Sequence, residues 1–337
     1  MRRWSKWLVG GSDRRCTFYD LRKIRPERRR PRSPIIQFYS SANNIGNYLP
    51  VLGIKKMLPF TTDVWCVHDK AIDFDFVNRH YRCGIVGGAG LLHFGFEPFW
   101  RALLRECRIP IMIWGIGCCM PDRVRSDPAQ LGVPRSVVAA VATRCDLVNV
   151  RDDVTAEYYG LDHVSIAPCP TVAYLDDVRN SRAPTRYDYL IALHKSLMSP
   201  EEVRSTFDVV KAMRVRAVYT ENRQTFHLGL SDVINALYRR SGAVITSRLH
   251  GAIVAYALEV PYVAIAYDEK LRAFCRLYGN GLCGSSAHDI APLSAELKAL
   301  PIRPPLIEPV YEFGRLASQW AAKHVVGSES AVPQPSP

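Results

Sequence analysis

The sequence predicts an α/β fold of two Rossmann-like domains with parallel sheets that face each other across a cleft. Its 337 residues exceed what one hydrophobic core usually serves, so two domains of about 150 residues each are expected. Short apolar runs alternate with helical periodicity along most of the chain. The hydrophobic fraction of 48% and the charged fraction of 23% are typical of a globular, soluble protein.

The first half of the chain predicts one parallel sheet covered by helices on both faces. Its predicted strands are residues 34–40, 83–86, 109–115, 147–151 and 164–167, and its predicted helices are residues 48–58, 98–107, 136–143 and 154–159. A polar loop over 41–47 joins the first strand to the first helix, and a glycine-rich turn over 87–90 follows the second strand. These elements make up a first domain over 34–178.

The second half repeats the alternation. Its predicted strands are residues 189–194, 217–220, 243–246 and 262–267, and its predicted helices begin at 199, 231 and 251. Ser199, Pro200 and Glu202 supply an N-cap, a first-turn proline and a capping-box glutamate. The polar, aperiodic stretch 176–186 predicts a linker. The second domain is expected over 187–325, and the Pro- and Ser-rich end, 328–337, is expected to be a disordered tail.

Positive charge is concentrated in a basic N-terminal arm, residues 1–33. This arm holds ten Arg and two Lys against three acidic residues, whereas the whole chain has a formal net charge of +12. The remainder is close to neutral, so we expect no nucleic-acid partner. Trp4, Trp7 and Leu8 lie among the basic residues, a mixture that suits an anionic membrane surface. A solvated, partly disordered arm is the alternative that the sequence leaves open.

No apolar run predicts a targeting signal or a membrane span. The run Trp7-Leu8-Val9 is too short for a secretory signal, and no run approaches the roughly 18 residues of a span. We therefore expect a cytoplasmic protein, peripheral on the inner face of the membrane if the arm binds lipid. The ten cysteines are scattered, and the adjacent Cys118-Cys119 pair lacks zinc or redox spacing, so no metal site is expected.

The chemistry is predicted at the turn Ser247-Arg248-Leu249-His250, which joins a buried strand to a small-residue helix. In parallel sheets, ligands bind at this carboxyl edge of the strands. Free backbone N–H groups and the helix dipole there favour a phosphate or a carboxylate, and Arg248 adds a fixed positive charge. A bound anion would favour protonated His250, whereas the helix N-terminus disfavours it, so the direction of its pKa shift stays open. An Arg and a His that only cap and pack are the structural alternative.

Four segments carry a resemblance to one family. The run from Thr246 to Lys270 is similar to the C-terminal signature of polysaccharide pyruvyl transferases, in which an R-L-H triplet precedes a small-residue helix and a buried strand ending near a Lys. The segments Asn44-Ile45-Gly46-Asn47, Gly87-Gly88-Ala89-Gly90 and Val150-Arg151-Asp152 resemble that family's N-x-G-D loop, glycine turn and R-[DE] element. They occur in family order over residues 34–275, and the R-L-H block is the specific part.

The resemblance implies a glycosyltransferase-B-like fold and a reaction with phosphoenolpyruvate. The enolpyruvyl group moves onto two hydroxyls of one sugar, in an exopolysaccharide or its lipid-linked repeat, and phosphate is released. The first domain would face the acceptor and the second would bind the donor. Arg151, Arg248, Ser247, Leu249 and Gly88 would bind the donor's phosphate and carboxylate. His250 would protonate the methylene carbon. No metal or cofactor is implied beyond phosphoenolpyruvate as co-substrate.

One position departs from the family pattern. The family's loop ends in Asp, which could act as a base or orient the acceptor, and this chain has Asn47. An amide does not accept a proton at neutral pH, so Asn47 either hydrogen-bonds the ligand or leaves the base to another residue. The carboxylates considered are Asp152, Asp268 and Glu221. His93 and His194 follow predicted strand ends, and we expect both to be packing histidines.

Three other functions stay open. A nucleotide-sugar glycosyltransferase would use the same cleft and the same arginine for a diphosphate. A dinucleotide-dependent oxidoreductase is suggested by residues 87–90, which lack G-x-G-x-x-G spacing and a paired acidic residue. A non-catalytic glycan-binding relative is favoured by Asn47. The acceptor sugar, the ketal stereochemistry and the oligomeric state are not predicted.

Overall fold

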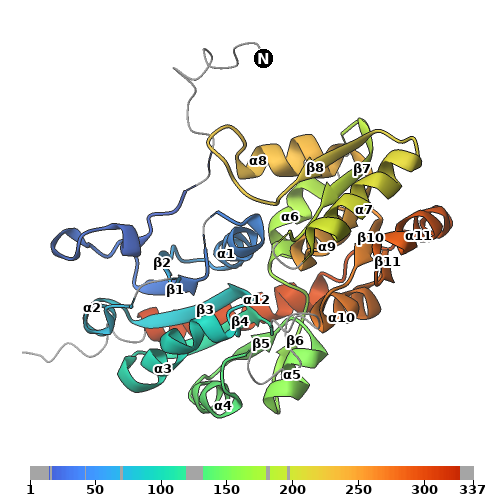
Figure 1. Ribbon diagram of the computed structural model, residues 1–337. Coiled ribbons are helices and arrows are strands. Elements are labelled where there is room, and N and C mark those ends of the chain that lie inside the picture. Colours follow the sequence, from blue (N-terminus) through green and yellow to red (C-terminus); the bar gives the residue numbers. More distant parts are fainter. Residues whose placement is uncertain are drawn as a thin grey trace, which may run out of the picture.

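The structure, a computed structural model, describes residues 15, 17–41, 43–68, 71–118, 132–179, 183–195 and 198–326. These residues form two lobes, each built on one parallel sheet (Figure 1). The strand order is β2-β1-β3-β4-β5-β6 in the first sheet and β11-β10-β9-β7-β8 in the second. The predicted fold, with two Rossmann-like domains, is confirmed.

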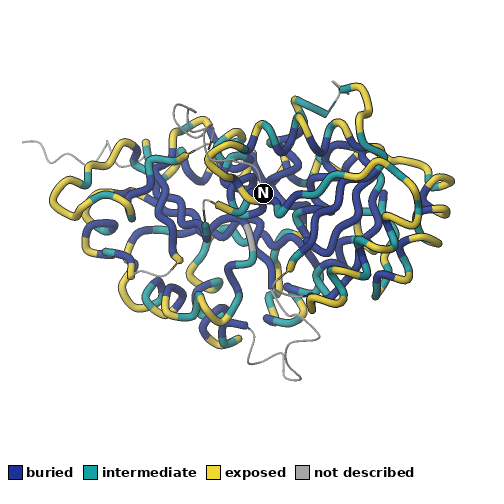
Figure 2. The backbone as a smooth tube through the Cα atoms, turned by 45° about the horizontal axis from the view of Figure 1, so that its top comes forward, coloured by how far each residue is buried: buried dark blue, intermediate teal, exposed yellow. Residues whose placement is uncertain are grey.

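The first sheet is buried between helices. Its strands are β1 (Ile35–Tyr39), β2 (Asp63–Cys66), β3 (Cys83–Ala89), β4 (Ile111–Ile116), β5 (Val148–Val150) and β6 (Ser165–Ile166). Its helices are α1 (Ile45–Met57), α2 (Phe74–His80), α3 (Glu97–Glu106), α4 (Arg135–Thr143) and α5 (Asp153–Tyr159). Every residue of β1, β2 and β4 is buried, because both faces of the sheet are covered (Figure 2).

The second sheet follows the same plan. Its strands are β7 (Tyr187–Ala192), β8 (Ala217–Thr220), β9 (Ser241–Thr246), β10 (Tyr262–Ile265) and β11 (Gly281–Gly284). Its helices are α7 (Pro200–Ala212), α8 (Leu230–Asp232, continued by Val233–Leu237 and Tyr238–Arg240), α9 (Leu249–Ala257), α10 (Glu269–Tyr278) and α11 (Ile290–Leu297). The predicted capping box of α7 is present, with Ser199 Oγ accepting from the Glu202 N–H at 3.1 Å.

Three predicted segments differ from the observed elements. The loop predicted over 41–47 is shorter, because the Asn44 side chain accepts from the Gly46 N–H at 2.9 Å and starts α1 at Ile45. The glycine turn predicted over 87–90 is mostly strand, since β3 continues to Ala89. Part of the predicted linker is helical, because buried Val172 and Leu175 hold α6 (Thr171–Arg179) in the core.

The last helix, α12 (Glu308–Val326), packs on the first domain (Figure 1). Phe313, Ala317 and Trp320 join a core cluster with Trp114 of β4. The Trp320 indole N–H also donates to Asp146 at 2.8 Å. The predicted second domain, 187–325, included this helix. Its apolar face packs on the first domain, so the predicted boundary is corrected.

The basic arm predicted over 1–33 is also corrected, because its second half belongs to the first domain. Phe18 stacks on Tyr48 with ring centroids 3.9 Å apart, and Leu21 is fully buried. Asp20 accepts a hydrogen bond from the Tyr39 hydroxyl at 3.0 Å, and Arg29 pairs with Asp73 at 3.0 Å. Residues 1–14, with Trp4, Trp7 and Leu8, lie outside the described residues, as do Cys119 and the predicted tail 328–337.

Helices α1, α6 and α9 form the contact between the domains. Ile45 and Leu49 of α1, Val172 of α6, and Ala252 and Ile253 of α9 share one buried apolar cluster. Residues that follow strands of both sheets therefore meet around one cavity, described below. In the described part of the chain, no helix has the length and apolar character needed to cross a membrane.

Candidate functional site

A cavity of about 210 Å³ lies between the two domains, lined by residues from both. Its polar residues lie in the loops and first helical turns that follow parallel strands, where helix N-termini and side chains converge. The first domain contributes Ser40, Asn44, Asn47, Gly90, His93, Phe96 and Arg151; the second contributes His194, Ser247, Arg248, Leu249, His250, Asp268 and Lys270. The lining holds three permanently positive side chains against one carboxylate, so it is built for an anion.

Arg248 is held in place by the turn between β9 and α9. Its Nε–H donates to the Leu193 carbonyl at 2.8 Å, and its backbone N–H donates to Thr246 Oγ1 at 2.9 Å. The residue is 8% exposed. Burial, and then the charge of Arg223, lower the pKa of Arg248, and a bound anion would offset both.

Two further cations reach the cavity from opposite domains. Arg151 follows β5, donates to the Cys118 carbonyl at 3.1 Å and lies 3.3 Å from Asp152. Lys270 follows β10 and pairs with Asp268 at 2.8 Å. The paired carboxylates are also the N-caps of α5 and α10. Each carboxylate therefore fixes both a helix N-terminus and a cation of the cavity.

The two most informative segments of the sequence touch each other. The His250 ring lies against Gly46 in the first turn of α1, where a side-chain Cβ would overlap the imidazole. Gly117 lies in the same way under the Arg151 guanidinium. Both glycines are needed because another group occupies the space that a Cβ would take. The Asn44–Asn47 segment and the Arg248–His250 segment therefore form one site across the domain boundary.

The pKa values of two of the three cavity histidines are lowered. His250 is half-buried, and burial lowers its pKa well below the usual value, with Arg151, Lys270 and Arg248 adding to the effect. Burial, then Arg248 and Lys270, lower the pKa of His194 to about 4. The sequence left the direction of the His250 shift open, because a bound anion and the helix dipole oppose each other. Burial and three converging cations decide it for the empty cavity.

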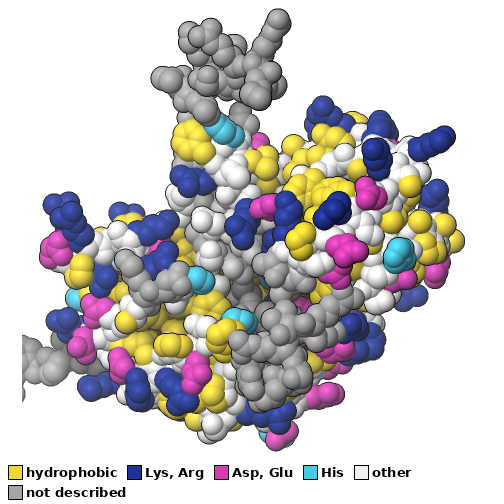
Figure 3. Space-filling view, viewed as in Figure 1, with side chains coloured by type: hydrophobic (Ala, Val, Ile, Leu, Met, Phe, Trp, Pro, Cys, Tyr) yellow, Lys and Arg dark blue, Asp and Glu magenta, His cyan; other side chains and the backbone are white. Residues whose placement is uncertain are grey.

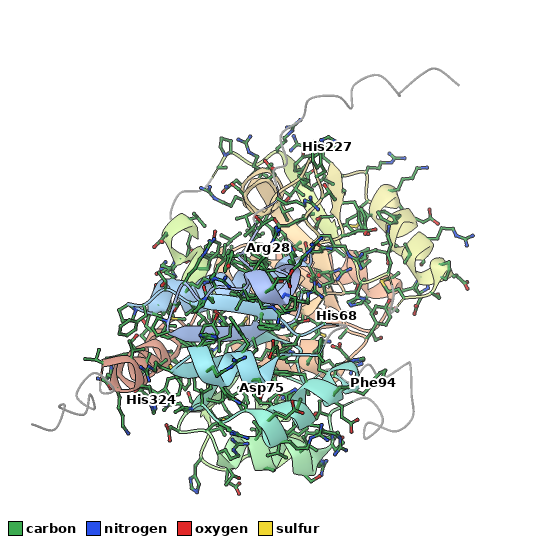
Figure 4. All side chains as sticks on the ribbon, turned by 90° about the vertical axis from the view of Figure 1, so that its left-hand side faces the viewer. Arg28, His68, Asp75, Phe94, His227 and His324 are labelled. Atoms are coloured by element: carbon green, nitrogen blue, oxygen red, sulfur yellow. The ribbon has the colours of Figure 1, made fainter. Side chains whose placement is uncertain are left out.

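The first-domain wall is polar and aromatic. Asn47 donates from Nδ2 to Ser40 Oγ at 3.3 Å, and both residues line the cavity. His93 and Phe96 line it beside them. Phe94 is 41% exposed and packs on His93 with ring centroids 4.2 Å apart. Figure 4 shows Phe94 and His68 on the same side of the first domain, and Figure 3 shows apolar side chains gathered on that face.

The structure brings most of the predicted site residues together. Asn47, Arg151, Ser247, Arg248, Leu249 and His250 all line the cavity. Gly88 does not: its backbone, at φ +76°, packs against Pro50 of α1, and Gly90 takes the place on the wall. Glu221 is not in the lining either and pairs with Lys195 at 2.9 Å. His93 and His194, expected to be packing histidines, do face the cavity.

Sequence reasoning missed Lys270, Ser40, Asn44 and Phe96 as site residues. The available signal was position, since Ser40 directly follows β1 and Lys270 closely follows β10. Larger hollows of about 700 and 710 Å³ lie elsewhere on the second domain. Neither brings cations from both domains together. Within the described residues, no group of three or more His, Cys, Asp or Glu side chains is arranged to hold a metal.

The fold and the cavity define the class of protein: a glycosyltransferase-B-like pair of Rossmann-like domains with a cationic cavity between them. A model of one family, polysaccharide pyruvyl transferase, matches residues 44–269. The chain belongs to this family of transferases, as its motifs predicted.

Solved structures share the fold at low identity. The UDP-GlcNAc 2-epimerase of Methanocaldococcus jannaschii, in complex with UDP-GlcNAc and UDP, is 9% identical with a TM-score of 0.56, over 85% of this chain and 99% of that one. MnaA of S. aureus, solved with UDP, is 11% identical with a TM-score of 0.54, over 90% and 98% of the two chains. No functionally curated protein matches the chain.

Proposed function

We propose that the protein transfers the enolpyruvyl group of phosphoenolpyruvate to a sugar of a surface polysaccharide or exopolysaccharide, or of its lipid-linked repeat. The product is a pyruvate ketal, and phosphate is released. The observation that carries the proposal is the convergence of Arg151, Arg248 and Lys270 on one small cavity of a pyruvyl transferase family member. The donor's phosphate and carboxylate together need this density of positive charge.

Cavity size favours a small acid over a nucleotide sugar. Drug-sized ligands occupy about 300–1,000 Å³, whereas this cavity holds about 210 Å³. The two solved structures named above hold UDP in the same fold, so a nucleotide sugar is the competing donor. We expect phosphoenolpyruvate to bind through side chains and backbone N–H groups with no metal or cofactor.

His250 is proposed as the acid that starts the reaction. It is neutral in the empty cavity, and a bound donor that offsets the three cations raises its pKa, so it takes up a proton with the donor. The imidazolium gives this proton to the methylene carbon, and an oxocarbenium-like centre develops at the neighbouring carbon. The acid is therefore charged only when its substrate is present.

The same imidazole can then serve as the base, which removes the need for a carboxylate at Asn47. After protonating the methylene, neutral His250 accepts the proton of the first attacking hydroxyl. The bond from the central carbon to the phosphate oxygen breaks, the second hydroxyl adds, and its proton leaves with the phosphate. Two C–O bonds and one C–H bond form, while the C=C π bond, one C–O bond and two O–H bonds break. The His250 proton ends in the new methyl group, the first hydroxyl proton restores the imidazolium, and the second hydroxyl proton leaves on phosphate.

The acceptor is proposed to bind the first-domain wall. Phe94 and Phe96 offer aromatic faces beside His93, and such faces pack well against the apolar side of a sugar ring. Asn47 and Ser40 offer hydrogen bonds for hydroxyl groups. Replacing Phe94 by Ala should raise the acceptor KM while leaving donor binding unchanged. Phe226→Ala is the matched control, because Phe226 is 45% exposed, packs on a neighbouring histidine and lies outside the cavity.

Phosphate release from phosphoenolpyruvate in the presence of oligosaccharide acceptors tests the proposal. Arg248→Ala and His250→Ala should each reduce the rate by about 10²–10³-fold, the usual cost of removing one preorganised charge-stabilising group. Arg216→Ala is the control, since Arg216 pairs with Asp188 on the surface, outside the cavity. Thermal shifts with phosphoenolpyruvate and with UDP-sugars separate the donors. Stabilisation by UDP-sugars alone, or undiminished activity in both variants, contradicts the proposal.

A further inference from the structure

We propose that Cys275 and Cys283 form a redox-active dithiol, in which Cys283 reacts with a peroxide and Cys275 closes a disulfide. This modification site lies in the second domain and does not use the cavity between the domains. It stands or falls independently of the pyruvyl transfer proposed above.

The two thiols are neighbours although they lie on different elements. Cys275 is in α10 and Cys283 in β11, and the chain reverses between them through Gly279 and Asn280, both at positive φ. Helix α10 contacts β11, and the two thiols interact there. Both line one open hollow of about 710 Å³, together with Arg272 and Arg276. A disulfide needs this kind of contact between two side chains.

Access separates Cys283 from the other described thiols. Cys66, Cys83, Cys107, Cys118 and Cys169 are buried, Cys145 and Cys275 are half-buried, and Cys283 is exposed. An oxidant in solvent therefore reaches Cys283 first. Cys275, partly covered behind it, is in the position of a resolving thiol.

The electrostatics of the pair support the same order of events. The interaction with Cys275, and then the charge of Arg272, lower the pKa of the Cys283 thiol against the effect of burial. The interaction with Cys283 and burial raise the pKa of Cys275. Cys283 is therefore the thiol that more readily forms the nucleophilic thiolate, and Cys275 is the thiol that more readily keeps its proton.

The reaction balances with a peroxide as the oxidant. The Cys283 thiolate attacks one peroxide oxygen, the O–O bond breaks, and Cys283 becomes a sulfenic acid while the leaving oxygen takes a proton as water or an alcohol. The Cys275 sulfur then attacks the sulfenic sulfur, the S–S bond forms, the S–O bond breaks and water leaves. The two thiols lose two electrons and the peroxide gains them.

The position of the pair gives the modification a route to the rest of the protein. The N-cap residue of helix α10, Asp268, and the second residue of the helix, Lys270, line the cavity. The same helix carries Arg276, which pairs with Asp153 of the first domain at 3.1 Å. A disulfide would tie the middle of this helix to the edge strand β11.

Peptide mapping of the full-length protein after hydrogen peroxide tests the proposal. Trypsin cuts after Arg276, so the two cysteines fall in separate peptides, 273–276 and 277–298. The folded protein is reduced, treated with hydrogen peroxide, blocked with iodoacetamide and digested without reductant. We expect the two peptides to be joined, with loss of two hydrogens, and to separate on reduction.

Variants test the order of the two steps. Cys275→Ser should leave Cys283 as a sulfenic acid that dimedone traps, whereas Cys283→Ser should leave Cys275 reduced at the same peroxide dose. Cys145→Ser is the matched control, because Cys145 is also half-buried, and it should keep the linked peptides. Recovery of both peptides from the wild type with iodoacetamide on Cys275 and Cys283 would overturn the proposal. The proposal would also be overturned if, in the Cys283→Ser variant, the peptide 273–276 were joined to a peptide with another cysteine in the same yield as the linked pair of the wild type.

Discussion

His250 shows how single residues acquire a role from their surroundings. Its ring is enclosed by Gly46 on one side and by the charges of Arg151, Arg248 and Lys270. An isolated histidine would titrate near pH 6.5, whereas burial and the neighbouring cations lower the pKa of this one well below that value. The proposed coupling of proton uptake to donor binding rests on this burial and charge.

His194 allows the same electrostatics to be tested through stability. Its folded-state pKa, about 4, is below the unfolded value near 6.5, so between these pH values the unfolded chain binds a proton that the folded chain does not. The free energy of unfolding should therefore fall as the pH drops from 6.5 toward 4, by up to about 1.4 kcal/mol per pH unit from this residue.

Urea unfolding of the wild type and of His194→Gln at pH 7, 6 and 5 measures this contribution. The variant should lose less stability on acidification than the wild type. His288→Gln replaces an exposed histidine outside the cavity and should keep the wild-type slope. Identical slopes in wild type and His194→Gln would show that His194 is not held neutral by the fold.

At the scale of elements, the contact between α1 and α9 joins the two domains at the site. The helices meet where Gly46 lies under the His250 ring, and their apolar residues share one cluster. The first turn of α1 therefore sets the position of the imidazole.

Gly46→Ala should disturb the site more than the fold. The added Cβ would overlap the imidazole, and overpacking of this kind typically costs about 1–3 kcal/mol. We expect donor affinity to fall by about tenfold or more, measured by calorimetric titration with phosphoenolpyruvate. Gly314→Ala is the helical control, since its Cβ would meet only the flexible Met57 side chain. Unchanged affinity in Gly46→Ala would contradict the close approach.

The elements also show how far the sequence could predict this structure. Strand β4 is a nearly continuous apolar run and β9 contains the apolar run Ala243–Ile245, so the sheets and the turn carrying Arg248 were predictable. The four-residue strand β2 begins with Asp63 and has no clear period, and it was missed. The position of Lys270 after a strand was visible in the sequence, but its place in one cavity with Arg151 was not, because this arises only when the two domains face each other. The charge-rich end of α6 was predicted to be a linker, because the buried residues of this helix contact another domain.

At the scale of the whole molecule, a segment near each end of the chain packs on the first domain. Helix α12 returns to the first domain, where Trp320 packs and donates to Asp146. The segment 17–33 packs on the first sheet through Phe18, Asp20 and Leu21. We therefore divide the predicted basic arm into residues 1–14 and the segment 17–33, and we expect different effects when each is removed.

Two truncations separate these parts. Deleting residues 1–33 removes fully buried Leu21 and the Asp20 hydrogen bonds, so Tm should fall by several degrees. If residues 1–14 bind anionic membranes, as the sequence predicts, their deletion should keep Tm and reduce sedimentation with anionic vesicles, and salt should weaken the sedimentation of the full chain. Vesicle binding that survives removal of residues 1–14 would assign it to another surface. If the protein that lacks residues 1–33 has the same Tm as the full chain, this result would contradict the packing of residues 17–33.

In the proposed function, one cavity binds phosphoenolpyruvate through three cations, and His250 becomes protonated as the donor binds. Calorimetric titration with phosphoenolpyruvate at pH 7.5, in two buffers of different ionisation enthalpy, measures affinity and proton uptake together. We predict binding with net uptake of close to one proton in the wild type, uptake lost in His250→Gln, and binding weakened at least about tenfold in Arg248→Ala. Absence of binding, or binding with the same proton uptake in His250→Gln, would contradict the account.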